Sequence, residues 1–438
     1  MRRGGHRGAG ISAQLVGVPL ITKRLVFQVG GYDPMSPEAA YRRFNRELRR
    51  FETTWGVTAR TTEAEVTPDE VRWRVVTRGP DWAVETVYHL VRWDDVIESD
   101  WKRSDWQRIP SGLLAFADFL WNGAFVGYLR SNWRYAGFFL YPYVLLAAMV
   151  IVALVGGIAA SDLSSSILVG AALAAALFVG LLQWPGRRLF VQHLLDDWIF
   201  ARRYIHGEHA VLRPRLDRVA KRLCEAARAS EADEVLVLGH SLGAVLAIDL
   251  LDRALRLEPR LGQDRSAVAF ISVGSSIPKI GLHRAAARFR AAVERVANAR
   301  AIFWGEYQTL TDVMSFYKVD PVTDMGLKGR SPLIRQVRVK AMLKPAFYRR
   351  MKRNLFRVHC QFVSANDRRA AYDYFMLLCG PLSAENQGRS RDGATSAVHL
   401  GGGPNLPAIE GQWRGDERGK RLAAVRPLGS SQRGYARQ

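Results

Sequence analysis

The apolar residues of the chain are unevenly distributed, and two long uncharged stretches stand out. One spans 136–160 and reads AGFFLYPYVLLAAMVIVALVGGIAA, and the other spans 163–184 and reads LSSSILVGAALAAALFVGLLQW. Each meets the length of about 20 apolar residues that a helix needs to cross the hydrocarbon layer. Only Ser161 and Asp162 separate them. The pattern predicts two transmembrane helices joined as a hairpin by a very short turn, the alternative being a buried hairpin in a soluble protein.

Arginines lie on both sides of this hairpin. They are Arg130, Arg134, Arg187, Arg188, Arg202 and Arg203, whereas the turn holds no Lys or Arg. Because positive charge is retained on the cytoplasmic side, we expect both ends of the hairpin to face the cytoplasm. The protein is then a multi-pass inner-membrane protein with nearly all of its polypeptide, including both termini, in the cytoplasm.

A second pattern, at 234–251, reads EVLVLGHSLGAVLAIDLL. The first five residues are typical of a buried parallel strand, and the last eight predict a helix with an apolar face. The pentapeptide between them fits G-x-S-x-G, in which a strained turn presents a serine between a strand and a helix. Gly239 and Gly243 would let the strand and the helix pass closely, and the helix N-terminus would direct free N–H groups at an oxyanion. The alternative is a tight turn with an inert serine.

With GHSLG at 239–243 the sequence resembles the α/β-hydrolase superfamily, particularly its lipase and esterase branch. The resemblance covers about 24–110 and 210–385. It implies an α/β fold with a mostly parallel sheet and helices on both faces, here interrupted by the two-helix hairpin. It also implies a Ser, acid, His triad in that chain order, with Ser241 as the nucleophile and His240 within the elbow.

The resemblance extends to a second turn near the start of the chain. Residues 24–29 form a strand pattern, followed by Gly30-Gly31-Tyr32-Asp33-Pro34 and by a helix capped at Ser36. Such hydrolases carry an oxyanion loop at this place. One donor would be the backbone N–H of Leu242, and the other would come from Gly31 or Tyr32. An ordinary β–α turn is the alternative.

The family order requires the catalytic histidine to follow both the serine and the acid. Three histidines are set aside by position: His240 in the elbow, His283 at the start of the helical stretch 282–298, and His399 near the C-terminus. His359 remains, and we expect it on the last strand, where it would act as the general base. On a strand the adjacent Cys360 would point to the opposite face, into the core.

Three aspartates compete for the role of the triad acid. Asp312 follows the strand pattern at 301–304, where the family places its acid. Asp320 lies in a Val-Asp-Pro-Val stretch that resembles the Asp-Pro-Val of many lipases, and Asp324 is a weaker third. We rank them in that order, with little separating the first two.

Basic residues are in excess over acidic ones, and part of this excess marks the two ends of the chain. Of 438 residues 63 are Lys or Arg and 41 Asp or Glu, a net charge of +22 that raises the question of nucleic acid. Part of the excess falls in a basic leader, 1–23, and a basic tail, 386–438, both expected to be disordered, and part flanks the two uncharged stretches. No zinc finger, aromatic RNA-binding signature or recognition helix accompanies it, so attraction to an anionic inner leaflet explains it better.

Between these ends we expect a single domain, 24–385, with 104–209 as a membrane insertion. The parts of the insertion outside the hairpin are expected to form helices that lie on the bilayer. The three cysteines are far apart and include no CxxC, which indicates a reducing compartment and no structural zinc site. No metal or organic cofactor is implied.

These patterns together suggest a membrane-anchored serine hydrolase. It would cleave ester or thioester bonds of a lipidic or acyl substrate through an acyl-enzyme. The alternative is a non-catalytic membrane scaffold that keeps the hydrolase fold, because a fold alone does not determine function. The residues leave open whether the acyl group passes to water or to another acceptor.

Overall fold

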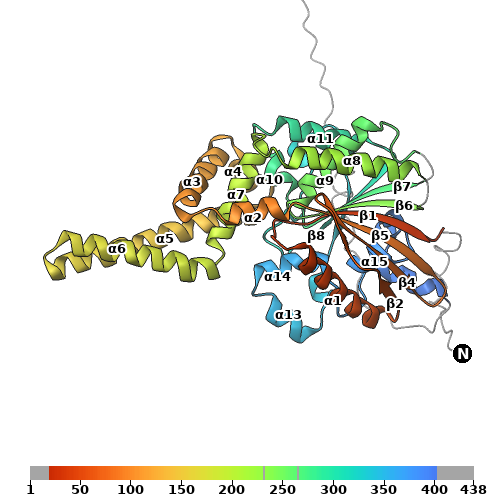
Figure 1. Cartoon of the computed structure of the whole chain (residues 1–438), viewed down its shortest axis with the longest axis horizontal. Coiled ribbons are helices and arrows are strands. Elements are labelled where there is room, and N and C mark those ends of the chain that lie inside the picture. The colour runs from red at the N-terminus through yellow and green to blue at the C-terminus, as the bar shows by residue number, and fades with distance from the viewer. Residues whose placement is uncertain (1–18, 230–231, 264–265, 402–438) are drawn as a thin grey trace, which may run out of the picture.

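A nine-stranded mixed β-sheet forms the centre of the protein, with helices against both of its faces (Figure 1). The computed structural model describes residues 19–229, 232–263 and 266–401. The strands are β1 (Lys23–Val29), β2 (Thr58–Thr61), β3 (Glu65–Val66), β4 (Glu70–Arg78), β5 (Ala83–Val91), β6 (Glu234–His240), β7 (Ala267–Val273), β8 (Ile302–Gln308) and β9 (Leu333–Gln336).

The order of the strands brings the loops that follow β1, β6 and β7 to one edge of the sheet. The order is β2-β4-β5-β1-β6-β7-β8-β9, with β3 paired to β4. Pairing is parallel from β5 to β9 and antiparallel among β2, β3, β4 and β5. Val29 of β1 lies opposite Gly239 of β6, which lies opposite Ser272 of β7. The carboxyl ends of these parallel strands therefore meet, where ligands of open α/β sheets bind.

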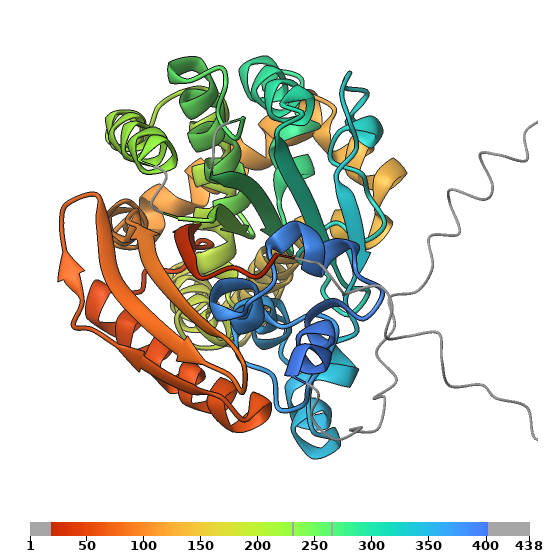
Figure 2. The same ribbon diagram turned by 90° about the vertical axis from the view of Figure 1, so that its right-hand side faces the viewer.

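Side chains along each strand point alternately to the two faces of the sheet, and this divides the core into two layers. On β1, Leu25 and Phe27 belong to one apolar cluster and Val26 to the other. Figure 2 shows the green helices above the sheet and the red α1 below it. The first layer contains α8 (Leu212–Arg228), α9 (Gly243–Leu257), α10 (Ile277–Gly281) and α11 (Ala287–Asn298). The second contains α1 (Pro37–Trp55), α12 (Val339–Met342), α13 (Pro345–Met351), α14 (Leu355–Cys360), α15 (Tyr374–Cys379) and α16 (Ala384–Arg389).

Between β5 and α8 the chain forms α2 (Asp94–Trp101) and then the helices of the insertion. The latter are α3 (Asp105–Trp121), α4 (Ala124–Ser131), α5 (Trp133–Ser164), α6 (Ile167–Leu181) with the π-helical turn η2 (Leu182–Gly186), and α7 (Val191–Ile205). Short 3₁₀ turns lie at η3 (Thr323–Met325), η4 (Gln361–Val363) and η5 (Gly393–Gly401).

The predicted pair of membrane-length helices is confirmed. Among the described residues, α5 and the α6–η2 helix are long and apolar enough to cross a membrane, with mean hydropathies of 2.6 and 2.1. They project together from the body of the protein (Figure 1). The predicted position of the turn was wrong. Helix α5 continues through Ser161 and Asp162, and the chain reverses at Ser165, whose φ of 51° places it in the left-handed region.

The base of the hairpin belongs to the folded domain. Ala136 and Phe139, near the start of α5, are buried in the first layer of the core, whereas Val155 and Ile158 farther along are 61% and 62% exposed. The expectation that the flanking segments lie on the bilayer was wrong for α7. Its Trp198 is fully buried, because α7 packs between α3 and the domain rather than along a surface.

The C-terminal boundary predicted at 386 was also wrong. Helix α16 and the turn η5 carry ordered structure to Gly401. The carboxylate of Glu234 accepts the N–H of Ala384 at 2.8 Å, and Arg335 donates to the carbonyl of Gly388 at 2.7 Å. Hydrogen bonds to the backbone do not require a repeated pattern of apolar residues, so no such pattern marks this ordered segment in the sequence. Residues 1–18 and 402–438 lie outside the described residues, where the disordered leader and tail stay predictions.

Candidate active site

Ser241 lies in a sharp turn between β6 and α9, at the edge where the parallel strands end. Its φ is 55°, in the left-handed region that non-glycine residues seldom adopt. The turn is tied to β7, because the N–H of Ser241 donates to Val273 at 3.2 Å and its carbonyl accepts the N–H of Ser276 at 3.1 Å. The strain is thus held by hydrogen bonds on both sides of the serine.

The two glycines of the elbow are required by close backbone contacts. A Cβ on Gly239 would lie 2.5 Å from Cα of Ala244, and a Cβ on Gly243 would lie 2.2 Å from the carbonyl oxygen of Gly30. Real Cβ atoms do not approach other atoms so closely. The strand and the helix therefore approach closely at these two glycines, as the sequence pattern predicted.

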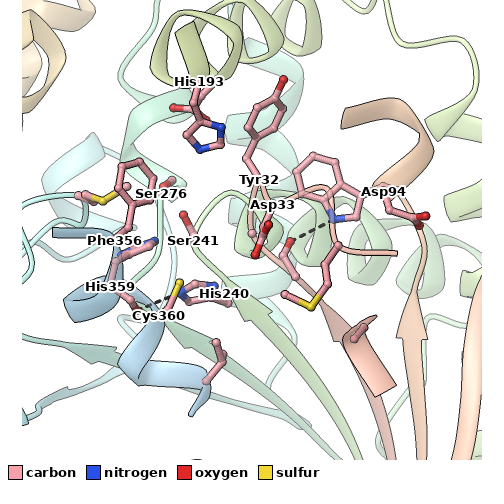
Figure 3. A pocket seen from close by; sticks show the side chains of 18 of the residues that line it. Tyr32, Asp33, Asp94, His193, His240, Ser241, Ser276, Phe356, His359 and Cys360 are labelled. Carbon is pink, nitrogen blue, oxygen red and sulfur yellow. Dashed lines mark hydrogen bonds between the residues drawn. The ribbon is translucent and has the colours of Figure 1, made fainter. Parts of the chain in front are cut away.

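His359 and Asp312 form a buried pair beside this turn. Nδ1 of His359 lies 2.6 Å from Oδ2 of Asp312, and neither side chain is more than 4% exposed. Oδ1 of Asp312 accepts the N–H of Met314 at 2.9 Å, which fixes the carboxylate. Nε2 of His359 is buried and has no hydrogen-bond partner among the described residues. In Figure 3 the imidazole of His359 is turned toward the side of the pocket where Ser241 lies.

The other two candidate acids lie elsewhere. Oδ1 of Asp320 accepts the N–H groups of Val322 and Thr323 at 2.8 and 3.2 Å. Asp324 accepts the N–H of Asp320 at 2.9 Å. Both carboxylates therefore stabilise the turn that leads into η3, and only Asp312 is brought to His359.

The expectation that His359 lies on a strand was wrong, because it lies on the short helix α14. The argument that placed Cys360 in the core fails with it. Cys360 lines the same cavity as Ser241 and His359, although burial raises the pKa of its thiol. Short helices of this kind lack the repeated apolar period from which a helix can be recognised in a sequence.

His240 connects the elbow to α14, a role that sequence reasoning missed. Its Nε2 donates to the backbone carbonyl of His359 at 3.2 Å, and the two imidazoles lie 4.6 Å apart (Figure 3). Burial, followed by the proximity of His359, lowers the pKa of His240 well below its ordinary value. His240 is therefore neutral, and its hydrogen bond to the backbone of α14 helps to position His359.

The predicted oxyanion loop lies against the elbow. A Cβ on Gly31 would be 3.1 Å from Cβ of Ser241. The side chain of Tyr32 turns away, since its hydroxyl donates to Asp100 at 3.1 Å. The backbone N–H groups of Gly31, Tyr32 and Leu242 have no acceptor among the described residues. Three free donors thus border the serine.

Ser241, His240 and His359 line a cavity of about 850 Å³, together with Gly31 and Tyr32. This volume lies in the range of small-molecule sites. The domain supplies Ser241, His359, Cys360 and Met314 to its wall, α2 supplies Trp101, and the insertion supplies Tyr135, Phe138, Phe190 and His193. The base of the membrane hairpin is therefore part of the lining.

Two buried polar groups near the site were not recognised from the sequence. Lys279 forms an ion pair with Asp197 in the cavity wall, and its ammonium lies 4.0 Å from the Trp198 ring. Glu306 on β8 bonds to the hydroxyls of Ser272 and Ser275, next to the turn that holds the elbow. Burial raises the pKa of Glu306 to about 8. The only signal in the sequence was an acidic or basic residue within an apolar stretch.

A further group of Asp118, His206 and His283 has the side-chain types of a metal site. Nδ1 of His283 accepts the N–H of Ala285 at 3.2 Å, so the proton of the neutral ring is on Nε2, which faces Asp118 at 3.4 Å. A protonated Nε2 cannot ligate a metal. The group is better described as a polar contact, in which Nε2 of His206 lies 2.9 Å from Asp118 and His283 faces the same carboxylate.

Comparison of the chain with protein-family models, curated proteins and solved structures found no match in any of the three.

Proposed function

We propose that this chain is a membrane-anchored serine hydrolase of the α/β-hydrolase type that cleaves an ester or thioester bond of a lipidic or acyl substrate. One observation carries the proposal: a serine in a strained strand–turn–helix shares a cavity with His359, and His359 is bonded to the buried carboxylate of Asp312. The order Ser241, Asp312, His359 along the chain is the order that this fold uses. Parallel pairing from β5 to β9 also supports a hydrolase-type sheet.

In the proposed reaction, the hydroxyl of Ser241 attacks the substrate carbonyl. Nε2 of His359 accepts the hydroxyl proton, and Asp312 orients the ring through Nδ1 and stabilises its charged form. The oxyanion accepts hydrogen bonds from the N–H of Leu242 and from Gly31 or Tyr32. The tetrahedral intermediate collapses, and His359 returns the proton to the leaving alcohol or thiol. Water then attacks the acyl-enzyme in the same way and regenerates Ser241.

The hairpin would hold the cavity at the bilayer. We place both ends of the hairpin and both termini on the cytoplasmic face of the inner membrane, on the strength of the flanking arginines. A C-terminal epitope tag tests this orientation: it should be digested by protease in inverted membrane vesicles and protected in spheroplasts. Substrate would then reach Ser241 from the inner leaflet, since hairpin residues such as Phe138 line the cavity.

The test is labelling by a fluorophosphonate probe, which modifies only activated serines. Membranes that contain the wild-type protein should show a labelled band, and Ser241→Ala should abolish it. Ser276→Ala is the matched control, because Ser276 lines the same cavity and is not part of the proposed triad. It should keep the label.

An unlabelled wild-type protein in native membranes would reject the hydrolase and favour the non-catalytic scaffold. A label that persists in Ser241→Ala would place the nucleophile elsewhere.

A further inference from the structure

His193 belongs to the insertion and lines the cavity of the candidate active site. It lies in the first turn of α7, just after the hairpin returns to the domain. Three aromatic rings surround its imidazole at centroid distances of 5.6 Å (Tyr32), 5.5 Å (Trp101) and 5.3 Å (Phe356). It lines the same cavity as Ser241, and Figure 3 shows it projecting from α7 into this pocket. The rings around it therefore hold it in place while it remains part of the cavity wall.

One nitrogen of this imidazole has no protein partner. Nδ1 of His193 is buried and makes no hydrogen bond to any described residue. Buried polar atoms nearly always have a partner, because an unmade hydrogen bond away from water is costly. The neighbouring aromatic rings offer none. A group of a bound molecule that reaches Nδ1 from the cavity would satisfy this nitrogen.

The surroundings of His193 select the kind of group. Burial lowers its pKa, and the carboxylates Asp197 and Asp33 oppose this shift without cancelling it. The imidazole is therefore neutral near pH 7 and offers one N–H donor and one acceptor nitrogen. The ammonium of Lys279 is already paired with Asp197, so it is not free to attract an anion. A hydroxyl, which is neutral and both donates and accepts, is the best complement.

We propose that His193 binds a free hydroxyl on the alcohol half of the substrate, so that the protein prefers acyl esters of polyols to esters of simple alcohols. The inference rests on the proposed function of Ser241. An acyl chain carries no such group, so the hydroxyl must belong to the alcohol half. A site built to bond a substrate hydroxyl discriminates against analogues that lack it, because its own polar atom is then left unpaired.

The experiment compares 1-monooleoylglycerol with methyl oleate, two esters of one acyl chain that differ in the free hydroxyls. His193→Phe keeps an aromatic ring among its neighbours and removes both nitrogens. It should lower kcat/KM for monooleoylglycerol about tenfold, the value of one hydrogen bond, and leave methyl oleate within about twofold. His193→Asn, whose amide reaches the position of Nδ1, should restore part of the preference.

His209→Phe is the matched control, because His209 packs on Phe200 and does not line this cavity. It should change both substrates equally. Equal losses for both substrates in His193→Phe, or no loss for either, would overturn the inference. A wild-type protein that takes the fluorophosphonate label but does not prefer monooleoylglycerol would overturn the inference alone. A wild-type protein that neither takes the label nor cleaves either ester overturns the proposed function as well.

Discussion

Replacement of Asp312 by Asn tests the pair on which the proposed mechanism depends. Asn has the same shape, but it carries no charge and can donate to Nδ1 of His359, which favours the wrong tautomer. The carboxylate lies 2.6 Å from Nδ1 and is fully buried. Solvent therefore does not replace the lost charge.

The size of the effect follows from the charge that develops in the transition state. When His359 takes the proton from Ser241, a positive ring forms beside Asp312. Two unit charges about 4 Å apart attract by about 4 kcal/mol at an effective dielectric constant near 20. At 1.36 kcal/mol per tenfold change in rate, Asp312→Asn should lower kcat about 10³-fold.

Asp320→Asn is the matched control, because it makes the same change in the rival acid. The amide oxygen of Asn can still accept the two N–H groups that Asp320 binds, so kcat should change less than about threefold. The assay is hydrolysis of a p-nitrophenyl ester by the solubilised protein, with thermal unfolding of each variant as a check on folding. A folded Asp312→Asn protein of unchanged activity, or a larger loss in Asp320→Asn, would refute the assignment of the acid.

Two further predictions concern stability. Gly243→Ala would place a Cβ 2.2 Å from the carbonyl oxygen of Gly30 and should reduce the free energy of unfolding by about 3 kcal/mol. Gly30→Ala is the control and should be neutral, because the space around its Cβ is open. Equal shifts of the thermal unfolding midpoint in the two variants would contradict the close contact. The pKa of Glu306 is raised by burial from 4.5 to about 8, so the wild-type protein should lose stability as the pH rises from 4.5 to 8, by at most about 5 kcal/mol at 1.36 kcal/mol per unit. Glu306→Gln, which is neutral at every pH, should flatten this part of the unfolding profile, and a wild-type profile that is already flat would show that the carboxyl is not buried in its neutral form.

Local patterns in the sequence were sufficient for two features. Two uncharged runs of about 20 residues are enough to predict membrane-length helices, because helix length depends only on the rise per residue. The turn after β6 was likewise predictable, since Gly239 and Gly243 are needed wherever a strand and a helix approach closely. The hairpin turn was misplaced because Ser161 and Asp162 are polar, although polar residues at the end of a hairpin can continue a helix.

Other features depend on contacts between distant segments, which no local pattern records. Little in the sequence separates Asp312 from Asp320, and only the tertiary structure, in which α14 contacts the end of β6, brings one of them to His359. His359 is held there by His240, which lies 119 positions away in the chain. The ordered segment around Gly388 has no apolar period because backbone hydrogen bonds hold it.

The fold alone also decides that the membrane insertion takes part in the cavity. Nothing in the sequence of α7 distinguishes His193 from the other histidines. It lines the wall of the cavity because the hairpin returns to the domain beside the carboxyl ends of β1 and β6. The sequence by itself therefore determines the two membrane-length helices and the elbow, whose causes are local. Only the tertiary structure decides which acid, which histidines and which part of the insertion surround Ser241.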